Sequence, residues 1–198
     1  MTVLKSKLDA KISSMLDRDE SPRIVARRLV FYEFSQVFAG DLDRGFSILN
    51  EVAEHFHIPI SCVRVVGSAQ FGYSYFKQRD FTPKLSDLDL AIVNSLIFQR
   101  YSEYIYWTTL RYTNLVEFPR RDGVSAAGPF REYLSAGYLR PDLMPESEMK
   151  EKWFSFFNQL SNKHSDVFKN INGGIFMSEG FLEMRNANLA DEFRKASK

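Results

Sequence analysis

The chain has 198 residues, with 26 Lys and Arg against 25 Asp and Glu, so its formal net charge is +1. This balance excludes a strongly cationic chain whose bulk charge alone would indicate nucleic-acid binding, and only a local basic groove is compatible with it. With 44% hydrophobic residues and 18 Phe, the composition predicts a globular protein and excludes a disordered one. The length suits one domain, or one domain with a helical extension.

Cysteine usage and the apolar pattern indicate the compartment. Cys62 is the only cysteine in the sequence, so no intrachain disulfide can form and a cysteine-rich zinc module is excluded. Residues 1–20 mix acidic and basic side chains, unlike a secretory signal. Charges also interrupt every apolar stretch before the roughly 18–20 residues that span a bilayer. We therefore expect a cytoplasmic protein without membrane insertion.

Residues 1–58 are expected to form an N-terminal helical extension. Apolar residues recur there at helical spacing, which predicts two or three helices. Ser21 and Pro22 supply an N-cap and a proline at the first helical position. Gly40 and Asp41 interrupt the pattern before the last helical segment, so helices precede the first strand.

Two strands are predicted within the next segment, residues 59–110. The β-branched run 60–66 ends at Gly67 and predicts the first strand, and the apolar run 88–93 predicts the second. Helical spacing follows from Ser95 to about residue 110.

The rest of the chain is less regular. Gly and Pro recur through residues 111–145, which predicts a loop-rich insert or lid. The C-terminal region, 146–198, is predicted to hold a helix to about residue 162 and a turn at 172–174, followed by a stretch that suits either strand or helix. Helices and strands together indicate an α+β protein with a single domain over residues 1–198.

Asp87 and Asp89 are the candidate metal ligands. In a strand they point to the same face, about 6.6 Å apart along the chain. Two carboxylates held close together repel, by as much as about 4 kcal/mol at 4 Å in an effective dielectric of 20, unless a cation bridges them. Ligands that are all oxygen suit Mg²⁺ or Mn²⁺, which also bind water and substrate phosphates.

Gly67 and Ser68, at the end of the first predicted strand, are candidate phosphate ligands. Because Gly67 has no Cβ, backbone N–H groups there can come close to an anion. The Ser68 hydroxyl can donate to a phosphate oxygen. These donors would complement the acidic pair, which would hold the metal that neutralises the phosphates.

The run Val66-Gly67-Ser68, followed by Ser86-Asp87-Leu88-Asp89-Leu90, resembles the signature of the DNA polymerase beta-like nucleotidyltransferase superfamily. The resemblance covers roughly residues 60–110 and implies a small mixed sheet backed by helices. It also implies a Mg²⁺-dependent enzyme that moves a nucleoside monophosphate from an NTP or dNTP to an acceptor hydroxyl, with Asp87 and Asp89 as catalytic metal ligands. The fuller pattern Gly-Ser-Ala-x-x-Gly-x-Ser is similar to small bacterial nucleotidyltransferases associated with phage defence.

The sequence departs from that signature in two ways, and each departure leads to a further prediction. The spacer between the motifs is longer than usual, which predicts an extra loop at 71–84 over the nucleotide site. A third carboxylate on a later strand is common in the superfamily, and Glu179, Glu183 and Asp166 are candidates by position. A site without it would still bind a nucleotide, and its catalytic activity is then the point to test.

Basic residues in the insert are candidates for contact with the triphosphate or an oligonucleotide, with Arg140 the preferred phosphate ligand. Asp142 is expected to hold Arg140 rather than metal. Aromatic side chains interleave with the arginines and can stack on bases, although an ordinary surface loop explains the same pattern equally well. The arginines are Arg111, Arg120, Arg121, Arg131 and Arg140, and the aromatics are Tyr112, Phe118, Phe130, Tyr133 and Tyr138.

Two other functions are open at this point. One is a non-catalytic nucleotide-binding regulator or partner protein, and the other is a toxin-like transferase that modifies RNA or protein. A nucleoside triphosphate is the expected substrate in the enzymatic cases. The acceptor can be an oligonucleotide, an RNA or a protein, and the product a nucleotide signal or an oligomer. A protein partner or a homo-oligomer is compatible with all of them.

Overall fold

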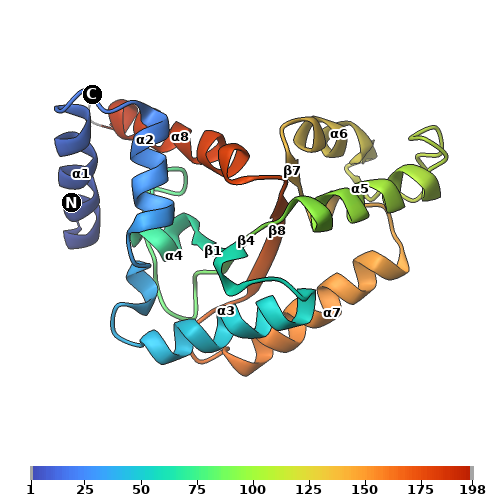
Figure 1. The fold of residues 1–198 in the computed structure, drawn as a ribbon, viewed down its shortest axis with the longest axis horizontal. Helices are drawn as coiled ribbons and strands as arrows, with labels where there is room; N and C mark the ends of the chain where they lie inside the picture. Colours follow the sequence, from blue (N-terminus) through green and yellow to red (C-terminus); the bar gives the residue numbers. More distant parts are fainter. Residues whose placement is uncertain (1, 197–198) are drawn as a thin grey trace.

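A computed structural model describes residues 2–196, and it is an α+β fold built on a four-stranded sheet with the strand order β1-β4-β8-β7 (Figure 1). Strand β4 pairs antiparallel with β1 and parallel with β8, and β7 pairs antiparallel with β8, so the sheet is mixed. Two short hairpins, β2–β3 and β5–β6, lie outside this sheet. The strands are β1 (Val63–Val66), β2 (Tyr73–Ser74), β3 (Arg79–Asp80), β4 (Leu88–Val93), β5 (Arg120–Arg121), β6 (Val124–Ser125), β7 (Tyr138–Leu139) and β8 (Ile171–Phe176).

The helices predicted before the first strand are present, and the last of them, α3, packs in the core of the sheet. The Ser21 hydroxyl accepts from the backbone N–H of Ile24, and Pro22 occupies the first helical position, as the sequence indicated. The α-helices are α1 (Val3–Leu16), α2 (Pro22–Arg27), α3 (Leu42–Phe56), α4 (Gly67–Phe71), α5 (Ser95–Thr108), α6 (Ala127–Ser135), α7 (Glu148–Lys163) and α8 (Glu179–Ala196). Shorter turns are η1 (Arg28–Tyr32, a π-helix), and the 3-10 turns η2 (Gln36–Phe38), η3 (Ile60–Cys62) and η4 (Pro141–Leu143).

The sheet separates two hydrophobic cores. Helices α3, α5 and α7 cover one face, whereas α1, α2 and α8 lie on the other side of the sheet (Figure 1). Strand β4 serves both cores, because Leu88, Leu90 and Ile92 point to the first face and Ala91 to the second. Asp89 therefore lies on the face of Ala91, towards α8, and Asp87 immediately precedes the strand.

The predicted turn at 172–174 is wrong, because these residues lie inside β8. Glycine is needed there for packing rather than for a turn. A Cβ on Gly173 would lie 2.3 Å from Cζ of Phe157, and a Cβ on Gly174 would lie 2.6 Å from Cε2 of Tyr138. Aromatic rings thus press on both faces of β8, and the two glycines make room for them.

Gly173→Ala should destabilise the protein, because buried rings of α7 fill the space that the new methyl group needs. We expect a loss of about 1–3 kcal/mol in the free energy of unfolding, measured by urea denaturation. Gly128→Ala is the matched control, because a Cβ there meets nothing within 4 Å. Equal midpoints for the two variants would contradict this packing.

Other boundaries differ from the sequence prediction. The first strand is shorter than 60–66, since residues 60–62 form η3, where Cys62 N–H donates to the carbonyl of Pro59. The insert 111–145 is more regular than expected and contains α6, with Pro129 in the first turn, where its missing N–H costs nothing. The ambiguous stretch after residue 174 completes β8 and then forms α8.

Within residues 2–196, none of the helices combines the length and the apolar character needed to cross a bilayer.

Candidate functional site

A cavity of about 720 Å³ opens on the face of the sheet that carries Asp89. Its walls come from the β1–α4 junction, the β2 hairpin, β4, η4, α7, β8 and α8. Four of the predicted site residues line it together, and they are Gly67, Ser68, Asp89 and Arg140. Segments distant in sequence therefore converge on one concave surface, of the size usual for small-molecule sites.

The predicted juxtaposition of the Gly67-Ser68 turn with the acidic pair is confirmed for Asp89. Strand β1 pairs with β4 so that Val66, the last residue of β1, lies opposite Asp89. Gly67 follows directly, with φ +66°, a conformation that favours glycine. A Cβ on Gly67 would lie 3.3 Å from Oδ2 of Asp89. A side chain at this position would crowd the carboxylate and narrow the cavity.

Strand β8 and the residue just before it supply an amide to each acid. Nδ2 of Asn170 donates to Oδ1 of Asp87 at 2.9 Å, and Nδ2 of Asn172 lies 3.5 Å from Oδ1 of Asp89. Parallel pairing causes this, because Asp89 and Asn172 are partners in the β4–β8 register. Asp87 is half-buried and lies beside the cavity rather than in its lining, whereas both asparagines line it.

The electrostatics of Asp89 favour a cation. Its side chain is open to the cavity, but protein surrounds it on the other sides. This limited hydration raises the pKa of the Asp89 carboxyl, with the Asn172 amide opposing the shift and the negative charge of Asp87 adding to it. An ionised Asp89 is thus less stable than a free aspartate until positive charge approaches.

The available donors fit a hard divalent cation, with carboxylate oxygens from Asp87 and Asp89 and amide oxygens from Asn170 and Asn172 after rotation of the amides. Nowhere in the described part of the chain do three or more His, Cys, Asp or Glu side chains converge as metal ligands. The site would therefore hold a cation with two charged ligands, leaving further positions to water or substrate.

The candidates for a third carboxylate lie elsewhere. Asp166 accepts from Arg44 at 2.8 Å on the other side of the sheet, and Glu183 is buried against Arg23 and Arg27. Glu179, in the first turn of α8, is outside the cavity lining. The position that faces Asp89 across the β4–β8 pair is an amide, Asn172.

Arg140 is bound by Asp142, as predicted. Its Nη2 and Nε donate to the two carboxylate oxygens of Asp142 at 2.6 and 3.1 Å. Partial burial alone would lower the pKa of Arg140, but the hydrogen bonds and charge of Asp142 raise it above its usual value. Arg121 also approaches Asp142, at 4.0 Å.

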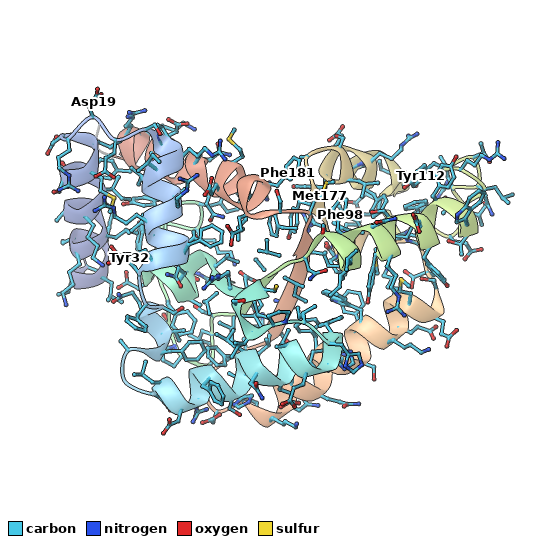
Figure 2. The ribbon with its side chains drawn as sticks, viewed as in Figure 1. Asp19, Tyr32, Phe98, Tyr112, Met177 and Phe181 are labelled. Carbon is cyan, nitrogen blue, oxygen red and sulfur yellow. The ribbon has the colours of Figure 1, made fainter. Side chains whose placement is uncertain are left out.

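The insert does not act as one basic surface. Arg140 is half-buried, whereas the exposed arginines of the insert stand outside the cavity lining, and they are Arg111, Arg120, Arg121 and Arg131. Phe118 and Phe130 are buried in the core and cannot stack on a base, and Tyr112, labelled in Figure 2 beyond the end of α5, packs on Phe130. Tyr138 is the aromatic residue of the insert that lines the cavity.

The extra loop predicted at 71–84 does border the site. Phe71 and residues 73–76 at its start line the cavity, and they include the β2 strand. Phe76 follows β2 with 90% of its surface exposed, and it lines the cavity as well. An aromatic face is therefore available to a ligand in the cavity that Asp89 lines.

Three of the lining residues could not be assigned from the sequence, and they are Asn170, Asn172 and Arg185. Asn172 was predicted to lie in a turn and Asn170 carried no signal, and only the structure shows that the two amides stand beside the acids. Arg185 is a lone basic residue in a helical pattern. Comparisons of the chain with models of known protein families, with curated proteins and with solved structures find no match.

Proposed function

We propose that this protein is a metal-dependent nucleotidyltransferase that uses a nucleoside triphosphate and transfers its nucleoside monophosphate to an acceptor hydroxyl. The observation that carries the proposal is the contact between the Gly67-Ser68 turn and Asp89 in one cavity. This arrangement would put donors to phosphate and ligands of a metal side by side, as transfer of a nucleoside monophosphate requires.

Asp87 and Asp89 would hold the cation, with Mg²⁺ or Mn²⁺ best suited to their oxygens, and Asn172 is placed to add an amide oxygen. The bound cation would supply charge neutralisation for the phosphates and polarise the reacting phosphoryl group.

The residues of the chain would position the substrates. Backbone N–H groups at Gly67 and the Ser68 hydroxyl would hold phosphate oxygens, and Arg140, already oriented by Asp142, would add positive charge. The acceptor oxygen would form a bond to the α phosphorus as the bond from that phosphorus to the bridging oxygen breaks. Pyrophosphate would leave, and the hydroxyl proton would pass to water in the open cavity.

The direct test is product analysis. Purified protein is incubated with Mg²⁺ and a mixture of the ribo- and deoxyribonucleoside triphosphates, and pyrophosphate release is measured alongside mass spectrometry of the products. We expect to find pyrophosphate and a new phosphodiester that joins the nucleoside to the acceptor hydroxyl. Product that migrates with added RNA or protein would identify a macromolecular acceptor, whereas small products would indicate a nucleotide signal or oligomer. Absence of pyrophosphate with every acceptor tested would contradict transfer.

A second candidate, a nucleotide-binding protein without transfer activity, is favoured by the amide at Asn172. A carboxylate there would give the site a third negative ligand, and an amide leaves the site with two. Tight binding of a metal–nucleotide complex without pyrophosphate release would support this candidate over the enzyme.

Asn172→Asp tests the role of this position in both candidates. Because the new carboxylate would face the cation beside Asp89, we expect Mn²⁺ affinity to rise by about tenfold or more, measured by calorimetry. If the natural protein only binds nucleotide, pyrophosphate release should appear or increase in the variant. Asn158→Asp, in the α7 part of the cavity lining, is the matched control. Unchanged Mn²⁺ affinity in Asn172→Asp would contradict the proposed metal site.

A further inference from the structure

Arg185, on α8, lines the same cavity as Asp89 and is held by aromatic rings. Its guanidinium carbon lies 5.2 Å from the ring centre of Tyr133 and 5.4 Å from that of Tyr138. The two tyrosine rings are perpendicular, with centres 5.7 Å apart, and the Tyr138 ring stacks on Phe176 at 4.3 Å. Cation–π contacts of this kind orient an arginine. Hydrogen bonding to Arg140, and more weakly to Arg185, also lowers the pKa of the Tyr133 hydroxyl, so Tyr133 holds both arginines.

Contacts on either side of Arg185 hold helix α8 in place. Two residues earlier, Glu183 is 4% exposed and accepts hydrogen bonds from Arg23 and Arg27 of α2. At the start of the helix, the ring of Phe181 covers Gly137, where a Cβ would lie 2.3 Å away; Figure 2 labels Phe181 near the junction of β8 and α8. Helix α8, which carries Arg185, is therefore held by ion pairs to α2 and by packing of Phe181 on Gly137.

The charge of Arg185 is not neutralised by a neighbouring acid. Among residues 2–196, no carboxylate lies within the 4.0 Å of an ion pair with its guanidinium, whereas Arg140 is paired with Asp142. Arg140 approaches the same ring as Arg185, with its guanidinium carbon 5.0 Å from the centre of Tyr133. Two guanidinium groups that share one tyrosine ring repel each other unless an anion lies near both.

We propose that Arg185 and Arg140 form an anion subsite for a phosphate group, separate from the ligands Asp87 and Asp89. Guanidinium groups bind phosphate oxygens in pairs of N–H donors, which makes them well suited to this anion. The phosphate belongs either to the triphosphate tail of the nucleotide or to the acceptor. Its assignment to a substrate rests on the proposed function, but anion binding itself does not.

The test uses inorganic tripolyphosphate in a buffer with a chelator, so that binding does not depend on the acidic pair. Calorimetry of the full chain should show binding that weakens by about tenfold or more in Arg185→Gln. Arg185→Lys should give an intermediate loss, because it keeps the charge without the paired donors. Arg194→Gln, an exposed arginine further along α8 that pairs with Asp191, is the matched control. Equal binding by the natural protein and Arg185→Gln, or no binding by the natural protein, would overturn the subsite.

Competition then identifies the source of the phosphate. If tripolyphosphate and a non-hydrolysable NTP analogue with Mg²⁺ exclude each other, the subsite holds the triphosphate tail. If they bind together, it holds a phosphate of the acceptor, and both results support the subsite. Pyrophosphate release that is equal in Arg185→Gln and the natural protein, together with unchanged tripolyphosphate binding, would overturn the subsite and leave the proposed transfer intact. Tripolyphosphate binding that depends on Arg185, without any pyrophosphate release, would support the subsite and contradict transfer.

Discussion

Replacing Asp87 and Asp89 together by Ala should lower Mg²⁺-dependent pyrophosphate release by about a thousandfold or more. Both charged ligands of the proposed cation are lost in this variant, and a bound metal is usually the largest source of charge stabilisation in phosphoryl transfer. Initial rates at saturating Mg²⁺ and NTP provide the measurement. Asp43→Ala with Asp191→Ala is the matched control, since it removes two exposed aspartates outside the cavity lining.

Loss of activity in this variant should not come from unfolding. The pKa of Asp89 is raised by its limited hydration, with a contribution from Asp87, so its ionised form costs stability at neutral pH. The metal-free variant should therefore melt at the same temperature as the natural protein or above it. Mg²⁺ should raise the melting temperature of the natural protein only. A variant that keeps its turnover would refute the role assigned to the two acids.

Replacing Arg23 and Arg27 together by Gln should lower the melting temperature at pH 7 by roughly 5 °C. Glu183 is 4% exposed, and these two arginines of α2 are its ion-pair partners. Leaving the buried Glu183 carboxylate without cationic partners lowers the stability of the fold. Loss of the two arginine side chains, which are half-exposed, has little effect of its own. Differential scanning calorimetry measures the change. Lys152→Gln, which breaks an exposed pair with Glu148, is the control with little expected effect.

The effect should depend on pH in a defined direction. Hydrogen bonds from Arg27, and then from Arg23, lower the pKa of the Glu183 carboxyl in the folded protein. The stabilisation is therefore fully present above the unfolded pKa of about 4.3 and is lost as pH falls through the lower folded pKa. The difference in melting temperature between the natural protein and the variant should shrink below about pH 4. A difference that stays constant from pH 7 to pH 3 would show that the ion pairs do not cause it.

Local signals predicted the elements that present the motif. The apolar run at 88–93 matches β4, and Ser21 with Pro22 marked the start of α2. Both signals depend only on residues that are adjacent in the sequence. The Gly67-Ser68 turn and Asp89 were expected together, and the antiparallel register of β1 and β4 brings them into contact.

The remainder of the site depends on contacts that neighbouring residues do not encode. The Asn-Gly-Gly run has the composition of a turn, and it forms a strand because the rings of Phe157 and Tyr138 need the space beside Gly173 and Gly174. That strand places Asn172 beside Asp89. The sequence had instead suggested Glu179, Glu183 or Asp166 as a third acidic residue of the site. Arg185 belongs to the cavity only because α8 packs against α2 and β8.

We expect a metal-bound triphosphate to lie between the Gly67-Ser68 turn and the carboxylates of Asp87 and Asp89. A crystal structure with Mn²⁺ and a non-hydrolysable NTP analogue tests it most directly, because Mn²⁺ is located by its anomalous scattering. We expect the anomalous peak at the carboxylates of Asp87 and Asp89, with analogue phosphates against the backbone of Gly67. An analogue bound elsewhere on the protein, or Mn²⁺ at a site without Asp89, would contradict the claim.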